Sequence, residues 1–239
     1  MKKIISYLSM CSILFALGSC TDIDNYDLPK ETFKGKFIDS TTGDAFLCEQ
    51  GTIHLRLEEL SWSDTPSPQS IPSKQDGSFN DSRLFGGHYR ISPYEGPFWP
   101  VEPIEIDIKG VTERDFTLTP YLKITNVDFQ VSGTTLTYSC KINAPLAQNN
   151  GQALPQILDL RAFINITPLV GNGANIADFS NQSAITIEQN WSDEIAATVY
   201  SGQITNLLPG RTFYIRMGAR VNDTFRRYNY SEIVEIKIP

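Results

Sequence analysis

The sequence predicts an all-β protein made of two β-sandwich domains in tandem, and three observations support this. The 239 residues include 14 prolines and 16 glycines, which favour turns over long helices. β-Branched and aromatic residues come in short bursts, as strands require. Within those bursts apolar and polar residues alternate, so each predicted strand buries one face and exposes the other.

The chain is expected to begin with a lipoprotein signal peptide, residues 1–19. Two lysines follow the initial methionine, and residues 4–17 carry no charge. This stretch is too short to cross a bilayer, which takes about 20 residues, but has the length of a signal peptide. The sequence LGSC at 17–20 resembles the lipobox of bacterial lipoproteins, which implies that Cys20 becomes the lipidated N-terminus. The alternative is an ordinary secretory peptide with an incidental cysteine.

Residues 20–30 are predicted to be an acidic tether. Asp22, Asp24 and Asp27 lie among polar residues that show neither strand nor helix periodicity. In lipoproteins of gut Bacteroidetes, acids just after the lipid cysteine resemble an export signal. The resemblance implies an outer-membrane, lipid-anchored protein exposed at the cell surface. The alternative is that these carboxylates only keep a linker soluble.

Residues 31–120 are predicted to form the first sandwich. FKGKFID gives a strand and STTGD a turn, and residues 53–57 alternate between apolar and polar side chains. A long turn-rich segment then ends in Asp76-Gly77, which is a hairpin signal. HYRIS, residues 104–109 and RDFTLTP supply further strands. GKFID, QDGSF and LFGGHYRI resemble the prealbumin-like or carboxypeptidase regulatory-like module, which implies a spacer or contact surface.

Residues 121–239 are predicted to form the second sandwich. Alternation is clear at 136–142, 158–166 and 213–221, and residues 234–238 give a last strand. Between Pro168 and Asp193 the periodicity fades, which indicates a long loop with one helical turn. LLPGRTFYIRMGARV resembles the fibronectin type III motif. The tyrosine-corner position of that family falls on Phe213, so the corner hydrogen bond is missing or comes from Tyr214.

The chain as a whole resembles an uncharacterised family of two-domain lipoproteins from gut Bacteroidetes. The resemblance is carried by YRISPYE followed by GPF, and by LLPGRTFYIRMGARV followed by YNYSEIVEIKI. Members are typically encoded beside SusC-like and SusD-like glycan importers. The resemblance therefore implies a role in handling polysaccharide at the cell surface, with oligosaccharides or polysaccharides and SusC/SusD-like proteins as partners.

Charge excludes some partners. The formal net charge is −7, and removal of the two signal-peptide lysines makes the mature chain −9, with no basic cluster. Nucleic acid and anionic lipid headgroups are therefore not expected as partners, and membrane contact is expected through the lipid anchor alone.

Cys48 and Cys140 are the cysteines left in the folded part. We expect no bridge between them, because they fall in different predicted domains.

The sequence predicts no enzyme, no cofactor and no metal site. HExxH, GxSxG and P-loop motifs are absent, as is EF-hand spacing. His54 lies on the wet face of a predicted strand and His88 at a strand start, so both are expected at the surface. Glu58 and Glu59 are adjacent and diverge on a strand, so they do not form a catalytic pair.

A glycan site needs aromatic rings for the apolar faces of sugars, with amides and carboxylates beside them for the hydroxyls. Two segments qualify, with Trp62 as a third candidate ring. The candidate residues are Tyr94, Phe98 and Trp99 in the first segment, and Gln189, Asn190, Trp191 and Asp193 in the second. The alternative is that these rings fill sandwich ends or the seam between the domains, which we favour for the first segment.

Two functions remain open at this point. One is a surface lipoprotein that binds glycan without catalysis in a polysaccharide utilisation system. The other is an assembly module that docks onto a SusC/SusD-like importer through a sheet face or edge and never contacts sugar.

Overall fold

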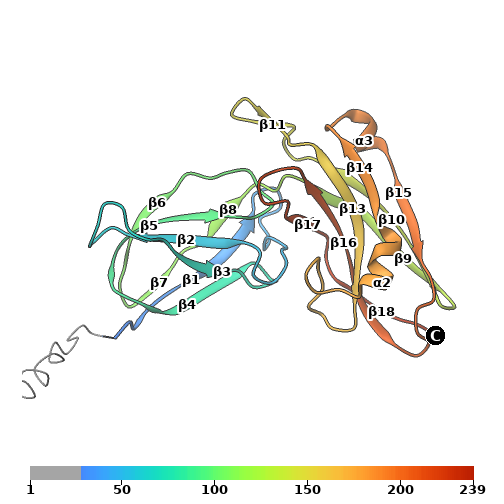
Figure 1. The fold of residues 1–239 in the computed structure, drawn as a ribbon, viewed down its shortest axis with the longest axis horizontal. Coiled ribbons are helices and arrows are strands. Elements are labelled where there is room, and N and C mark those ends of the chain that lie inside the picture. The colour runs from blue at the N-terminus through green and yellow to red at the C-terminus, as the bar shows by residue number, and fades with distance from the viewer. Residues whose placement is uncertain (1–27) are drawn as a thin grey trace, which may run out of the picture.

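The computed structural model describes residues 28–239, which fold into two β-sandwich domains side by side (Figure 1). The all-β prediction is confirmed. The signal peptide, the lipidation at Cys20 and most of the tether lie outside the described residues. Within the described part of the chain, no helix is long and apolar enough to cross a membrane.

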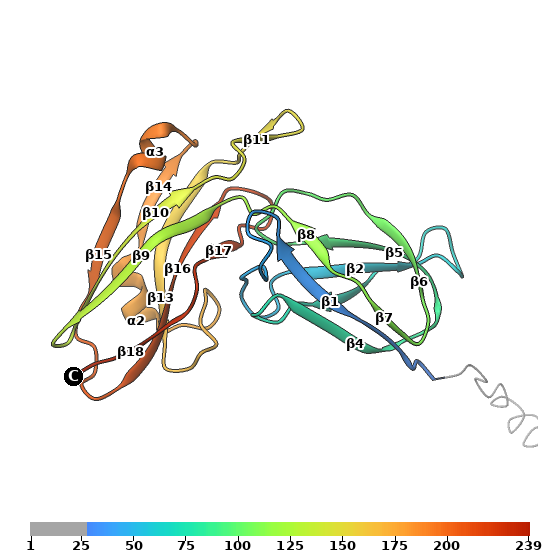
Figure 2. The same ribbon diagram turned by 180° about the vertical axis from the view of Figure 1, so that it is seen from behind.

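The N-terminal domain packs two sheets face to face (Figure 2). The first sheet contains β4 (Ser78–Leu84), β1 (Glu31–Asp39), β7 (Val111–Glu113) and β8 (Phe116–Leu118). The second contains β3 (Gln69–Pro72), β2 (His54–Glu59), β5 (Gly87–Tyr94) and β6 (Ile104–Ile108). Aromatic rings fill the space between the sheets: Phe79 lies 5.2 Å from Phe37 and 6.0 Å from Phe116, measured between ring centroids. Such tilted pairs add to the stabilisation from burying the rings.

β1 pairs in parallel with β7 and then with β8, and one glycine allows the break between them. A β-carbon on Gly35 would lie 1.9 Å from the carbonyl oxygen of Arg114, so only glycine fits here. At the break, the carboxylate of Asp115 takes the place of a backbone acceptor, because it accepts a 2.8 Å hydrogen bond from the backbone N–H of Lys36.

The turn at Asp76-Gly77 is closed as a tight hairpin turn, with the N–H of Lys74 donating to the carbonyl oxygen of Ser78 at 2.7 Å and the N–H of Gly77 donating to that of Lys74 at 3.1 Å. The strands on either side do not pair with each other, so the hairpin prediction holds for the turn alone. β3 pairs with β2 in one sheet and β4 pairs with β1 in the other. The turn instead carries the chain from one layer of the sandwich to the other. Gly77 has φ +75°, which favours glycine as the hairpin signal assumed, but that signal cannot distinguish a hairpin from a change of sheet.

The C-terminal domain is a second sandwich. One sheet contains β15 (Tyr200–Ile204), β10 (Thr135–Asn143) and β9 (Lys123–Ser132). The other contains β14 (Ile185–Gln189), β13 (Ile157–Asn165), β16 (Thr212–Val221), β17 (Tyr228–Tyr230) and β18 (Val234–Lys237). A hairpin of β11 (Gln148–Asn149) and β12 (Gln152–Ala153) projects from this domain in both views (Figures 1 and 2). Three short helical turns complete it, namely α2 (Ala177–Ser180), a 3₁₀ turn η1 (Asn181–Ser183) and α3 (Asp193–Ala197).

Three details of this domain differ from the prediction. The segment expected to be a long loop also contains β14. A bulge in β13 buries Ile157 completely and leaves Leu158 half-buried, which shifts the predicted alternation, and Ile166 lies beyond the strand with 58% of its surface exposed. Phe213 is fully buried, and Tyr214 hydrogen-bonds Glu235 on β18, so Tyr214 does not supply a tyrosine corner.

Cys48 and Cys140 are free thiols buried in different cores, as their predicted domains implied. Burial raises the pKa of Cys48 to about 11 and that of Cys140 to about 12. A thiol reacts as its thiolate, so both should be inert in the folded protein. We expect the Cys20→Ser mature chain to show no rapid reaction with dithionitrobenzoate at mildly alkaline pH and to label at both thiols in guanidinium. Rapid labelling of either thiol without denaturant would contradict the burial described.

Candidate functional site

The two domains are joined through a carboxylate of the N-terminal domain that is held by the C-terminal domain. Glu49 accepts hydrogen bonds from the hydroxyl of Tyr230 at 2.9 Å and from the backbone N–H of Asn172 at 3.1 Å. It also accepts from the backbone N–H of Gly173. Burial raises the pKa of Tyr230 well above its usual value, so its hydroxyl keeps the proton that it donates. The bonds give this half-buried carboxylate hydrogen-bond donors from the C-terminal domain, which offset the cost of its partial burial.

A guanidinium is buried next to this carboxylate. Arg216, on β16, is 1% exposed, and its Cζ lies 3.7 Å from the centre of the Tyr230 ring. Its Nη1 donates to the carbonyl oxygen of Cys48 at 3.0 Å, across the domain boundary. Burial lowers the pKa of Arg216, and the charge of Glu49 is among those that oppose this shift. The buried charge of Arg216 is therefore stabilised by groups at the domain interface, namely the Tyr230 ring, the Cys48 carbonyl and Glu49.

Further pairs fix the domains against each other. Arg227 Nη2 lies 2.6 Å from Glu95 Oε1. The side chain of Asn229 donates to the carbonyl oxygen of Pro97 at 2.9 Å and accepts from the N–H of Leu122 at 3.0 Å. Two concave sites at this interface are each lined by residues from both domains.

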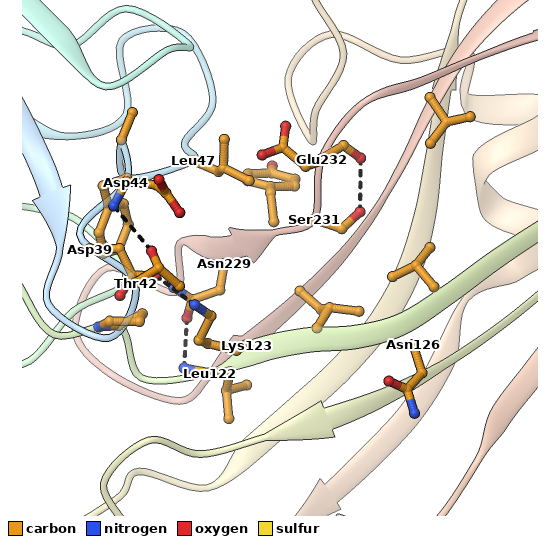
Figure 3. Close-up of a pocket in the computed structure, with 17 residues that line it drawn as sticks. Asp39, Thr42, Asp44, Leu47, Leu122, Lys123, Asn126, Asn229, Ser231 and Glu232 are labelled. Carbon is orange, nitrogen blue, oxygen red and sulfur yellow. Dashed lines mark hydrogen bonds and ion pairs between the residues drawn. The ribbon is translucent and has the colours of Figure 1, made fainter.

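The first is a cavity of about 390 Å³ (Figure 3). Figure 3 shows Lys123 next to Asp39 and Thr42, and Lys123 Nζ lies 3.0 Å from Asp39 Oδ2. The aromatic residues that line it, Phe46 and Tyr230, are almost fully buried. Lys123 and Asp39 are paired with each other and the lining offers no exposed ring, so we interpret this cavity as part of the interface.

The second site has an exposed ring and a volume of about 630 Å³, and we call it the Tyr94–Phe225 pocket. Its N-terminal wall is the end of β5 and the loop after it, and its C-terminal wall is the loop between β16 and β17. The lining includes Tyr94, Glu95, Gln152, Asn222, Asp223 and Phe225.

The rings of this pocket meet across the domain boundary. Tyr94 and Phe225 have centroids 6.5 Å apart at an interplanar angle of 74°. Phe225 is 43% exposed, so part of its ring is open to a ligand. The backbone is strained on both walls, with φ +65° at Glu95 and +52° at Arg226. Such strain in residues other than glycine concentrates at functional sites.

Polar groups flank the rings. Glu95 is paired with Arg227, and Asp223 accepts a 2.6 Å hydrogen bond from the backbone N–H of Arg226. Partial burial raises the pKa of Asp223. The amides of Gln152 and Asn222 lie on the same lining. An exposed ring and a half-buried ring with carboxylates and amides beside them match the requirements for holding a sugar.

Comparison with known proteins identifies the family. Residues 31–119 match "Protein of unknown function (DUF3823) N-terminal domain", and residues 122–235 match "Domain of unknown function (DUF3823_C)". The chain belongs to the two-domain DUF3823 family. No curated protein matches this chain.

Solved structures share the fold of this DUF3823 chain. A DUF3823 family protein from Bacteroides uniformis is 27% identical, with a TM-score of 0.78, over 88% of this chain and 100% of its own. One from Parabacteroides merdae is 22% identical, with a TM-score of 0.68, over 88% and 100%. A Bacteroides uniformis protein described as a "putative carbohydrate binding protein" is 18% identical, with a TM-score of 0.72, over 87% and 99%.

Of the first candidate segment, Tyr94 and Phe98 line the open pocket of this DUF3823 protein, and Trp99 does not. Phe98 is 4% exposed and packs in the N-terminal core, whereas Trp99 is 2% exposed and packs in the C-terminal core. Trp99 contacts Tyr121 with ring centroids 5.1 Å apart. Adjacent residues on an extended chain point in opposite directions, so this pair links the two cores. Both rings are too buried to serve as a sugar platform. Their positions match the alternative that they fill the seam between the domains.

The second candidate segment lies elsewhere on the C-terminal domain. Trp191 is half-buried against the core, and Gln189, Asn190 and Asp193 are exposed. Ser192 caps α3 by accepting from the N–H of Ile195. These residues line neither of the two pockets. Trp62, the third candidate ring, is 69% exposed on the loop after β2.

Both histidines have protein partners. His88 is exposed, and hydrogen bonds to Asp107 and then Glu105 raise its pKa. His54 is half-buried rather than pointing freely to solvent, because its ring lies between Ser70 Oγ at 2.8 Å and the carbonyl oxygen of Gly51 at 2.9 Å. Among residues 28–239, no group of three or more His, Cys, Asp or Glu side chains could hold a metal ion.

The C-terminal wall of the pocket was not predicted from the sequence. Asn222, Asp223, Thr224 and Phe225 form a turn cluster in the sequence, and the available signal was an aromatic residue within it. Nothing in the sequence places this turn opposite Tyr94, because the contact depends on the orientation of the two domains.

Proposed function

We propose that this protein is an outer-membrane lipoprotein at the cell surface that binds saccharide without catalysis, as a component of a glycan-uptake system. The observation that carries the proposal is the Tyr94–Phe225 pocket. Its two rings come from different domains, Phe225 is 43% exposed, and amides and carboxylates lie beside the rings.

Two further observations support the proposal. The lipobox-like sequence around Cys20 and the acids after it match the pattern expected of a surface lipoprotein. A protein of the same fold from Bacteroides uniformis is described as a "putative carbohydrate binding protein". Mass spectrometry of the native N-terminus tests the anchor: acyl groups on Cys20 are expected, and a free thiol there contradicts it.

Phe225→Ala is expected to weaken saccharide binding about tenfold, which is about 1.4 kcal/mol, because the substitution removes one of the two rings. The measurement is titration calorimetry of the Cys20→Ser mature chain against a panel of oligosaccharides. Phe85→Ala is the matched control, since Phe85 is 44% exposed, close to the 43% of Phe225, and does not line the pocket. Equal losses in both variants would contradict the assignment.

Trp191→Ala separates this pocket from the other candidate. We expect it to leave oligosaccharide affinity unchanged, because Trp191 lies outside the pocket and packs against the C-terminal core. Loss of binding in Trp191→Ala, with binding intact in Phe225→Ala, would move the site to Trp191. If no oligosaccharide of the panel binds and a SusC/SusD-like importer co-purifies from solubilised membranes, the assembly module is favoured instead.

A further inference from the structure

The lining of the Tyr94–Phe225 pocket has a one-sided charge. It contains two carboxylates, Glu95 and Asp223, and no lysine, arginine or histidine. A ligand in the pocket therefore meets hydrogen-bond acceptors with negative charge and no cation on the lining to balance a charge of its own.

The nearest basic groups are already engaged. Arg227 does not line the pocket, and its Nη2 lies 2.6 Å from Glu95 Oε1. The ring nitrogen Nδ1 of His54 lies 3.9 Å from Glu95 Oε2. Both groups act on the same carboxylate, whereas the hydrogen bonds that Asp223 accepts from Arg226 and Phe225 come from backbone N–H groups. The charge of Arg226 also acts on Asp223, but Arg226 does not line the pocket, so Asp223 is the charged group that the C-terminal wall contributes to the lining.

The hairpin beside the pocket is polar and uncharged. Gln152 and Ala153 of β12 belong to the lining, and the hairpin projects outward from there (Figure 1). Its side chains are mostly amides, contributed by Gln148, Asn149, Asn150 and Gln152. Amides donate and accept hydrogen bonds, so they suit the hydroxyls of a sugar and offer no charge to a carboxylate or sulfate.

We propose that the Tyr94–Phe225 pocket selects uncharged saccharide chains and rejects chains that carry uronate or sulfate groups. The inference rests on the proposed function. A neutral sugar donates hydrogen bonds from its hydroxyl groups to Glu95 and Asp223, because an ionised carboxylate accepts hydrogen bonds and has none to donate. An acidic sugar instead brings a second negative charge into a partly desolvated site, where repulsion is stronger than in water.

The test is a panel at low ionic strength, by calorimetry on the Cys20→Ser mature chain. Neutral probes are hexasaccharides of cellulose, xylan, mannan, galactan and amylose, and acidic probes are alginate and chondroitin sulfate oligosaccharides. Hexagalacturonate and its fully methyl-esterified form are a matched pair that differs in charge. Glycans that lose about tenfold or more in affinity on Phe225→Ala are counted as pocket ligands.

We expect every pocket ligand to be uncharged and acidic counterparts to bind at least about tenfold more weakly. In Asp223→Asn, which keeps the oxygen that accepts from Arg226, the ratio of neutral to acidic affinity should fall about fivefold. Glu95→Gln is the second variant, with the same direction expected because it also frees Arg227.

Three results would overturn the inference. An acidic glycan that binds as tightly as the neutral ones and depends on Phe225 overturns charge selection but leaves the proposed function standing. If the ratio of neutral to acidic affinity is unchanged in both Asp223→Asn and Glu95→Gln, these two carboxylates do not determine the selectivity. A panel on which no glycan depends on Phe225 removes the proposed function, and this inference with it.

Discussion

Glu49→Ala is expected to lower the free energy of unfolding by about 3 kcal/mol and to split thermal unfolding into two transitions. The substitution removes the acceptor of three hydrogen bonds from the C-terminal domain. It leaves the hydroxyl of Tyr230 and the guanidinium of Arg216 buried without the carboxylate. Differential scanning calorimetry measures both effects, since domains that lose their interface unfold separately.

Glu49→Gln is the control for this prediction. It keeps an oxygen acceptor and removes the charge, so we expect a loss of about 1 to 2 kcal/mol. Because Glu49 does not line the Tyr94–Phe225 pocket, a fall in saccharide affinity in Glu49→Ala would show that the pocket depends on the orientation of the domains. A single transition at the temperature of the unsubstituted protein would contradict the role given to Glu49.

Trp99→Ala is expected to cost about 3 to 5 kcal/mol of unfolding free energy, the range for removal of a buried large aromatic ring. Trp99 is 2% exposed and belongs to the core of the C-terminal domain although it follows the N-terminal β5. Its loss leaves a cavity beside Tyr121. Urea unfolding followed by circular dichroism measures the change.

Trp99→Phe should cost less than half as much. It retains an aromatic ring, and within the described residues the Nε1 of Trp99 has no hydrogen-bond partner to lose. If alanine at this position changed stability by less than about 1 kcal/mol, Trp99 would not be the core residue described here.

Sequence patterns predicted the strands well where one face packs inside its own domain. The alternation of Phe213, Ile215 and Met217 correctly placed one face of β16 in the core. The other face was expected to be wet, yet Arg216 and Gly218 are buried. The reason is that the N-terminal domain and β17 cover that face, and periodicity within one segment carries no information about a distant segment.

The candidate site shows the same limit. Tyr94 was found because it is an aromatic residue in a stiff loop of mixed polarity, and it does line the pocket. The same rule also selected Phe98 and Trp99, which belong to the cores. Phe225 and Asp223 were not predicted because they face Tyr94 only when the two domains have the observed orientation. That orientation is fixed by contacts between distant residues, namely the Arg227–Glu95 ion pair, Arg216 stacked on Tyr230, and the Glu49 hydrogen bonds.

Hydrogen exchange with and without saturating neutral hexasaccharides from the panel shows where saccharide binds on the protein. If saccharide binds between the domains, exchange should slow in both walls, at residues 92–98 of the N-terminal domain and at residues 222–227 of the C-terminal domain. Slowing confined to one domain or to residues 189–193, or no slowing with any hexasaccharide, would contradict a saccharide site built by both domains.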